Sequence, residues 1–166
     1  HDIPHTVAQA VVAAARLEVD LLTVHTSGGS AMLRAAEEAA QAAETTPLVL
    51  GVTVLTSMDD DDLHAVGVID NATAQVNRLA QLAIDSGLRG LVCSPRELPV
   101  LRAALGSGIK LVPPGIRPAG SDAGDQKRTL TPAEAMAAGA NWLVIGRPIT
   151  AAENPRAAAE AILATL

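Results

Sequence analysis

Short apolar runs alternate with longer alanine-rich stretches along nearly the whole of this chain. The apolar runs have the length of buried strands and cover residues 21–25, 48–55, 90–94, 110–114 and 142–146. The other stretches have the amphipathic periodicity of helices and cover residues 7–17, 31–43, 72–84, 98–105, 132–138 and 155–166. This alternation predicts a parallel α/β fold. Because no linker or low-complexity segment divides the chain, we expect residues 1–166 to form a single domain.

Three of the predicted helices begin with recognisable N-terminal signals. Ser94 and Thr131 each stand three residues before a glutamate, Glu97 and Glu134, with a proline directly after the serine or threonine. This is the capping-box pattern with proline at the first helical position. Asn154, also followed by a proline, is a third signal of a helix start.

Two segments near the C-terminus combine glycine, proline and arginine at the end of a predicted strand. They are VPPGIRPAGSDAGDQKR, residues 112–128, and WLVIGRPIT, residues 142–150. In parallel α/β folds the carboxyl ends of the strands meet at one face and carry ligands. Gly146 lets a backbone amide approach an anion, Arg147 offers a permanently charged fork, and Arg117 and Gln126 on the preceding loop would close around the same anion. The sequence therefore predicts a two-part site for a phosphate ester, although either arginine alone is also typical of a solvated surface.

Composition excludes several classes of function. The net charge of −6, the lack of Phe and Tyr and the presence of one Trp argue against nucleic-acid binding, which favours a basic face and stacking aromatics. No apolar run approaches the roughly 18 to 20 residues that span a membrane. The single cysteine, Cys93, has no partner for an internal disulfide, which is typical of a reducing compartment. We therefore predict a cytoplasmic protein that binds neither membranes nor nucleic acid.

A run of four aspartates, Asp59 to Asp62, follows the second predicted strand. Such a run suggests a metal site, but we interpret it as a solvated helix start that is stabilised by the helix dipole. His5 and His64 have no partner at the spacing of metal ligands. We predict no metal site.

Four motifs together resemble orotidine 5′-phosphate decarboxylase of the bacterial type. They are PGIRPAGSDAGDQKR, VIGRPIT, VTVLTSM and the opening HDIPHTV, and the resemblance covers essentially the whole chain. It implies a (β/α)8 TIM barrel that decarboxylates orotidine 5′-monophosphate to UMP, the last step of de novo pyrimidine synthesis. It also implies that no metal or organic cofactor takes part and that the enzyme is a homodimer with shared active sites.

The resemblance carries functional roles onto individual residues. Asp2 matches the last aspartate of the family's alternating Lys/Asp array, which is contributed across the dimer interface, and Thr6 lies with it near the ribose hydroxyls. The other substrate-binding positions that match are Thr56, Ser94, Arg117, Gln126, Gly146 and Arg147. For Ser94 a contact with the base and a purely capping role remain equally open.

The length of the chain is short for such a barrel. A complete barrel needs roughly 200 residues or more and eight strands, whereas this sequence has 166 residues and about five predicted strands. We therefore expect it to hold about the last five strands, the C-terminal two-thirds of the barrel. The resemblance places the catalytic lysines of the array upstream of residue 1.

Two alternatives to the decarboxylase remain. Related barrels that also bind phosphate with their last two strands include hexulose-phosphate synthases and ribulose-phosphate epimerases, although an epimerase would need metal-binding histidines. The other alternative is not an enzyme but a phosphate-binding barrel fragment or an interaction module, whose open strand edges would favour aggregation.

Overall fold

A four-stranded parallel sheet forms the centre of the protein in the computed structural model, which describes residues 1–118 and 129–166. The sheet order is β1-β2-β3-β4, and each strand pairs with the next one along the chain. The strands are β1 Leu21–His25, β2 Leu48–Val52, β3 Gly90–Val92 and β4 Lys110–Leu111. Parallel neighbours of this kind need a crossover between them, which the intervening helices provide.

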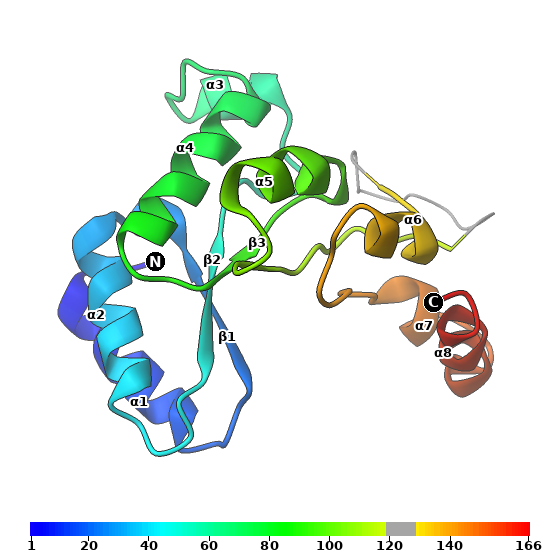
Figure 1. Ribbon diagram of the computed structural model, residues 1–166, viewed down its shortest axis with the longest axis horizontal. Helices are drawn as coiled ribbons and strands as arrows, with labels where there is room; N and C mark the ends of the chain where they lie inside the picture. Colours follow the sequence, from blue (N-terminus) through cyan, green and yellow to red (C-terminus); the bar gives the residue numbers. More distant parts are fainter. Residues whose placement is uncertain (119–128) are drawn as a thin grey trace.

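Eight α-helices and two 3-10 turns lie around the strands in the described part of the chain. They are α1 Pro4–Ala15, η1 Thr26–Gly28, α2 Ser30–Gln41, α3 Asp60–Ala65, α4 Ala72–Asp85, η2 Pro95–Glu97, α5 Leu98–Leu105, α6 Pro132–Ala137, α7 Arg147–Thr150 and α8 Pro155–Leu163. Helices α1 and α2 pack beside β1 and β2, while α6, α7 and α8 lie on the far side of β3 in Figure 1. The predicted alternation of strand and helix is confirmed from β1 to β4.

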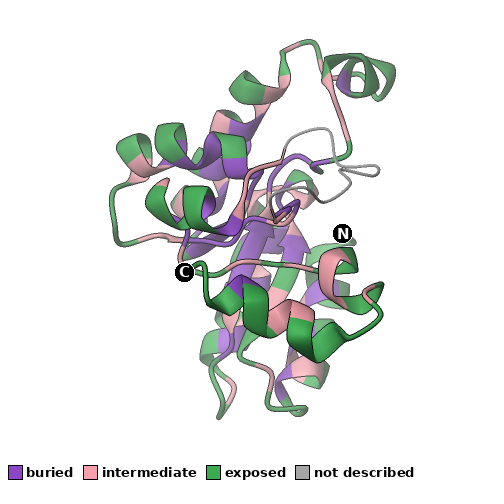
Figure 2. Cartoon of the chain, turned by 90° about the vertical axis from the view of Figure 1, so that its right-hand side faces the viewer, coloured by how far each residue is buried: buried purple, intermediate pink, exposed green. Residues whose placement is uncertain are grey.

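The hydrophobic core lies between the sheet and the inner faces of the first helices, where buried residues gather in Figure 2. Side chains that are fully excluded from solvent come from α2, β2, α4, β3 and α5: Met32, Leu33, Val49, Val76, Leu91 and Leu98. Gly90 leaves room for the Leu50 side chain between β2 and β3, because a β-carbon at this position would lie 2.4 Å from Leu50 Cδ2 and would force that side chain to move. Consecutive buried residues in β2 are typical of a parallel strand that is covered on both faces.

The three predicted helix starts are confirmed. The Ser94 amide donates to Glu97 Oε2 (2.8 Å) while Ser94 Oγ accepts from the Arg96 amide (3.3 Å), which closes a capping box at η2. Thr131 and Glu134 form the same reciprocal pair at α6. At α8 the side chain of Asn154 accepts from the amide of Ala157 (3.0 Å). Each cap satisfies amides that the first helical turn leaves without a partner.

The fifth predicted strand, residues 142–146, is irregular chain and not a strand, which corrects the prediction. It is joined to the preceding segment by hydrogen bonds from the Asn141 amide to Leu111 O (2.8 Å) and from the Val144 amide to Pro113 O (3.1 Å). The prolines that follow β4 have no N–H to donate, so the ladder cannot continue in both directions. This break explains why β4 itself contains only two residues.

The helices in the described part of the chain lack the combination of length and apolar character needed to cross a bilayer.

Candidate active site

Threonine hydroxyls join the carboxyl ends of the first three strands. Thr26, directly after β1, is fully buried, and its Oγ1 donates to the carbonyl oxygen of Val52 (2.8 Å). Thr53, directly after β2, donates in the same way to the carbonyl oxygen of Val92 (3.0 Å). These bonds hold the strand ends, and therefore the loops that follow them, in place. Neither residue was predicted as part of the site, although a hydroxyl side chain immediately after a strand is a usable signal.

Thr56 and Ser94 occupy the loops after β2 and β3. Both are buried, with exposed fractions of 7% and 0%. The Ser94 hydroxyl accepts a hydrogen bond from the Arg96 amide, so its capping role is confirmed, while its contact with a base stays a prediction. Thr56 precedes α3 on the same side of the sheet.

Arg117 lies at the base of the loop that follows β4. Its amide donates to Leu130 O (2.9 Å), and Ile116 forms a parallel bridge with Leu130. Residues 116 and 117 therefore lie beside residue 130. The side chain is largely buried and its Nη1 donates to Ile116 O (2.9 Å). Gly115 has a φ of +74°, a conformation that suits glycine and turns the chain after the two prolines. Gln126 lies outside the described residues.

Gly146 and Arg147 follow the irregular segment that begins at residue 142. Gly146 is the N-cap residue of α7 and Arg147 is the first residue of that helix, and both are exposed. The hydrogen bond from Val144 to Pro113 links this segment to the chain that carries Arg117. Two permanently charged guanidinium groups therefore come from neighbouring segments at the carboxyl ends of the strands, as expected for an anion site.

Asp2 and Thr6 lie at the opposite end of the sheet order. Together they line a hollow of about 340 Å³ between α1 and strand β1. Both side chains are exposed, and Asp2 Oδ1 accepts from the amide of Ile3 (2.6 Å). Asp2 precedes α1 and Arg147 begins α7. In Figure 1 these two helices lie on opposite sides of β3.

The aspartate run forms a helix start, which confirms its interpretation. Asp59 is the N-cap of α3 and makes a capping box with Asp62: each side chain accepts from the other residue's amide at 3.1 Å. The three aspartates in the first turn lie where the helix dipole favours negative charge. Asp60 also accepts from the Ala72 amide (2.7 Å), which ties α3 to α4.

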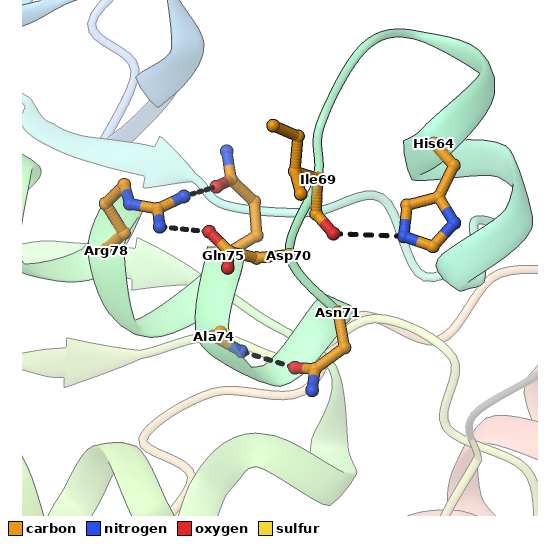
Figure 3. A network of polar contacts seen from close by, with 7 residues as sticks. All are labelled: His64, Ile69, Asp70, Asn71, Ala74, Gln75 and Arg78. Atoms are coloured by element: carbon orange, nitrogen blue, oxygen red, sulfur yellow. Dashed lines mark hydrogen bonds and ion pairs between the residues drawn. The ribbon is translucent and has the colours of Figure 1, made fainter.

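Contacts in the loop between α3 and α4 account for His64 (Figure 3). Its Nε2 is 3.1 Å from the carbonyl oxygen of Ile69. The next residues are held by an ion pair between Asp70 and Arg78 and by the N-cap bond from the Ala74 amide to Asn71 Oδ1 (2.9 Å). His64 thus has a structural partner in this loop.

The fold and the site define a parallel α/β protein with basic side chains at its strand ends. The chain belongs to the orotidine 5′-phosphate decarboxylase / HUMPS family, which it matches over residues 1–162. An orotidine 5′-phosphate decarboxylase of Opitutus terrae is 59% identical over 166 residues, which are 100% of this chain and 72% of that protein. Another from Idiomarina loihiensis is 51% identical with the same coverage.

Solved structures agree with the sequence comparison. The crystal structure of orotidine 5′-phosphate decarboxylase from Lactobacillus acidophilus superposes with a TM-score of 0.86 at 39% identity, covering 99% of this chain and 71% of that one. The enzyme from Pyrococcus horikoshii gives a TM-score of 0.72 at 26% identity, over 99% of this chain and 69% of that one. The predicted barrel family is confirmed, and this chain covers part of such a barrel.

Proposed function

We propose that this protein decarboxylates orotidine 5′-monophosphate to UMP. The observation that carries the proposal is the 59% identity, over the whole chain, to a protein named orotidine 5′-phosphate decarboxylase. The family name also includes the HUMPS group. Relatives from other bacteria that cover the whole chain at 51% to 55% identity share the decarboxylase name, which favours this activity over sugar-phosphate chemistry.

In this proposal the phosphate of the substrate binds to a phosphate grip, which we define as Arg117, Gly146 and Arg147, with Gln126 completing it. Support comes from the placement of the two arginines on neighbouring segments at the carboxyl ends of the strands. Binding energy from a phosphate remote from the reacting carbon helps to hold the pyrimidine in its site, and so raises the chemical rate as well as the affinity. Thr56 and Ser94, buried after β2 and β3, would then face the nucleoside.

Asp2 and Thr6 have a different role in the proposal. Departure of CO₂ leaves an electron pair on C6 of the pyrimidine, and a proton must then be added there. A carboxylate close to the substrate carboxylate disfavours the bound substrate relative to the transition state, in which that charge is leaving. We assign this function to Asp2 and a ribose contact to Thr6. The two lysines of the sequence are Lys110, at the start of β4, and Lys127. Lys110 is thus at the opposite end of its strand from the site.

We further propose a cytoplasmic homodimer. Support comes from the hollow that contains Asp2 and Thr6, which lies beside β1, whereas Arg147 follows a segment that is hydrogen-bonded to the chain of β4. Cys93 is buried and is the single cysteine of the sequence, which is compatible with a reducing compartment.

The phosphate assignment is tested by comparing UMP with uridine. We expect calorimetry to show tighter binding of UMP, and Arg147→Ala to weaken UMP binding by about 10- to 100-fold because a charge-assisted hydrogen bond contributes roughly 1.5 to 3 kcal/mol. Uridine affinity and thermal stability should not change, since Arg147 is exposed.

The matched control is Arg156→Ala, which removes an equally exposed arginine that pairs with Glu160 on α8. It should leave UMP binding unchanged. Unaltered UMP affinity in Arg147→Ala would contradict the phosphate assignment. The activity itself is assayed directly by monitoring decarboxylation as a loss of orotidine absorbance.

A further inference from the structure

The guanidinium group of Arg102, in the last turn of α5, joins two loops at the opposite end of the sheet from the phosphate grip. Its Nη1 donates to the carbonyl oxygens of Gly106 (2.7 Å) and Ile109 (2.9 Å), in the loop that leads to β4. Its Nη2 donates to Gly139 O (2.6 Å) and to Asn141 Oδ1 (3.0 Å), in the turn after α6. One side chain therefore connects the start of β4 to the start of the segment that leads to Arg147.

This arrangement is specific for arginine. Four acceptors that lie in different directions match the planar fork of a guanidinium, whereas a lysine offers three donors from a single nitrogen. The turn is also shaped around the side chain, because a β-carbon on Gly139 would lie 3.1 Å from Arg102 Nε and the φ of Gly139 is +104°. Hydrogen bonds from a charged donor are stronger than those between neutral groups, so the guanidinium is an effective clamp.

Asn141 passes this constraint on to β4. Its side-chain Oδ1 accepts from the Leu111 amide (2.9 Å), and its own amide donates to Leu111 O (2.8 Å). Both backbone groups of Leu111 that face the segment are thus paired with one residue. The next backbone bond between the two segments runs from the Val144 amide to Pro113 O (3.1 Å), three residues further along one segment and two along the other, so the pairing shifts by one residue after Asn141.

The alignment matters because few backbone bonds maintain it. A slip of one residue moves an extended chain by about 3.3 Å and turns every side chain to the other face. Gly146 and Arg147 lie five and six residues after Asn141 in this segment, so such a slip would displace them from Arg117 in the proposed phosphate grip. We propose that Arg102 and Asn141 are positioning residues that fix the register of residues 141–147 against β4 and thereby set the geometry of the phosphate grip. This inference rests on the proposed function.

The test uses Arg102→Lys and Asn141→Ala in the full chain, with two readouts. Amide hydrogen exchange reports the alignment directly, and we expect the Val144 amide to lose protection in both variants. Calorimetry with UMP and uridine reports the consequence. We expect UMP affinity to fall about tenfold, since small misplacements of a positioned group are costly, and uridine affinity to stay at the wild-type value.

The matched control is Arg89→Lys. Arg89 precedes β3 at the same end of the sheet as Arg102. Its Nε is 3.3 Å from Glu37 Oε1, so this side-chain bond reaches α2 and not residues 139–147. Replacement of Arg89 should lower thermal stability without changing the ratio of the affinities for UMP and uridine.

Two results would overturn the inference. One is an unchanged hydrogen-exchange rate of the Val144 amide in Arg102→Lys and Asn141→Ala, and the other is an equal loss of affinity for UMP and uridine. If the wild-type protein binds UMP no better than uridine, the proposed phosphate site fails. The exchange of Val144 then still decides whether the register depends on Arg102.

Discussion

Residues 1–111 and the C-terminal segment 129–166 are built differently although both alternate extended chain and helix. In the first region Met32, Leu33 and Leu91 are completely buried, and the strands pair in regular parallel ladders. In the second region Trp142 is 44% exposed and Leu163 is 67% exposed. The first region supplies most of the core, whereas the second carries the exposed Arg147 of the proposed phosphate grip. The core is therefore concentrated in the first region, while the proposed site takes residues from both.

The largest expected difference between the regions concerns apolar side chains. Leu91→Ala removes a fully buried side chain from β3 and should lower the free energy of unfolding by about 2 to 5 kcal/mol, because it leaves a cavity. Leu163→Ala, at the end of α8, should change it by less than about 0.5 kcal/mol. Urea denaturation measures both. Equal losses would show that the second region is as tightly packed as the first.

A smaller difference is expected for hydroxyl groups. Thr26→Val leaves the Val52 carbonyl without the hydroxyl that donates to it at 2.8 Å, and should cost about 1 to 2 kcal/mol in the same urea experiment. Thr165→Val removes a bond of similar length, 2.7 Å to Ile162 O, from the exposed end of α8 and should cost less than about 0.5 kcal/mol. Thr26→Ser, which keeps the hydroxyl, should recover most of the loss. If it does not, methyl packing and not the hydrogen bond is responsible.

The smallest expected effect is the pH dependence of α6. The hydroxyl of Thr131 and then its backbone amide hold the pKa of Glu134 below its ordinary value. A lowered carboxyl pKa in the folded state stabilises the helix above the ordinary pKa, and this contribution is lost as the pH falls through the lowered value. Thr131→Val should raise the pKa of Glu134 toward its ordinary value, as measured by NMR titration of the carboxyl carbon.

The consequence for α6 is measured separately. Protection of the Ala138 amide, which donates to Glu134 O (2.9 Å), should decline in acid in the wild-type protein. In Glu134→Gln the same amide should show no such decline. An identical acid response in both proteins would mean that this carboxylate does not contribute to the stability of α6.

Local features of the fold were predictable because they depend on residues close together in the sequence. The capping boxes at Ser94 and Thr131 and the helix start at Asp59 involve partners only three residues away, and all three are confirmed. The positions of the first four strands were also correct, but β2, β3 and β4 end earlier than predicted, at Val52, Val92 and Leu111, and the predicted strand 142–146 did not form. Hydrophobic runs continue past the last ladder bond, since residues buried beneath a loop are as apolar as those in a strand.

The sequence predicts the chemistry of the candidate site but not its arrangement. Glycine beside arginine at a strand end predicts an anion site, and the motif resemblance predicts which anion binds there; both stay predictions. No sequence pattern indicated that Asp2 lies beside β1 while Arg147 follows a segment that is hydrogen-bonded to the chain of β4. The clamp at Arg102 was also invisible, because three of its four acceptors are backbone carbonyl oxygens, which any residue possesses.

The sequence by itself determined the strand and helix alternation, the helix starts and the residue types at the strand ends, because each follows from periodicity or from contacts within a few positions. Only the tertiary structure decided which distant backbone groups meet. The Asn141 side chain accepts a hydrogen bond from the Leu111 amide, thirty residues away in the sequence. The Thr26 hydroxyl, after β1, donates to the Val52 carbonyl at the end of the adjacent strand β2. Such bonds depend on the packing of whole elements, which no local sequence pattern specifies.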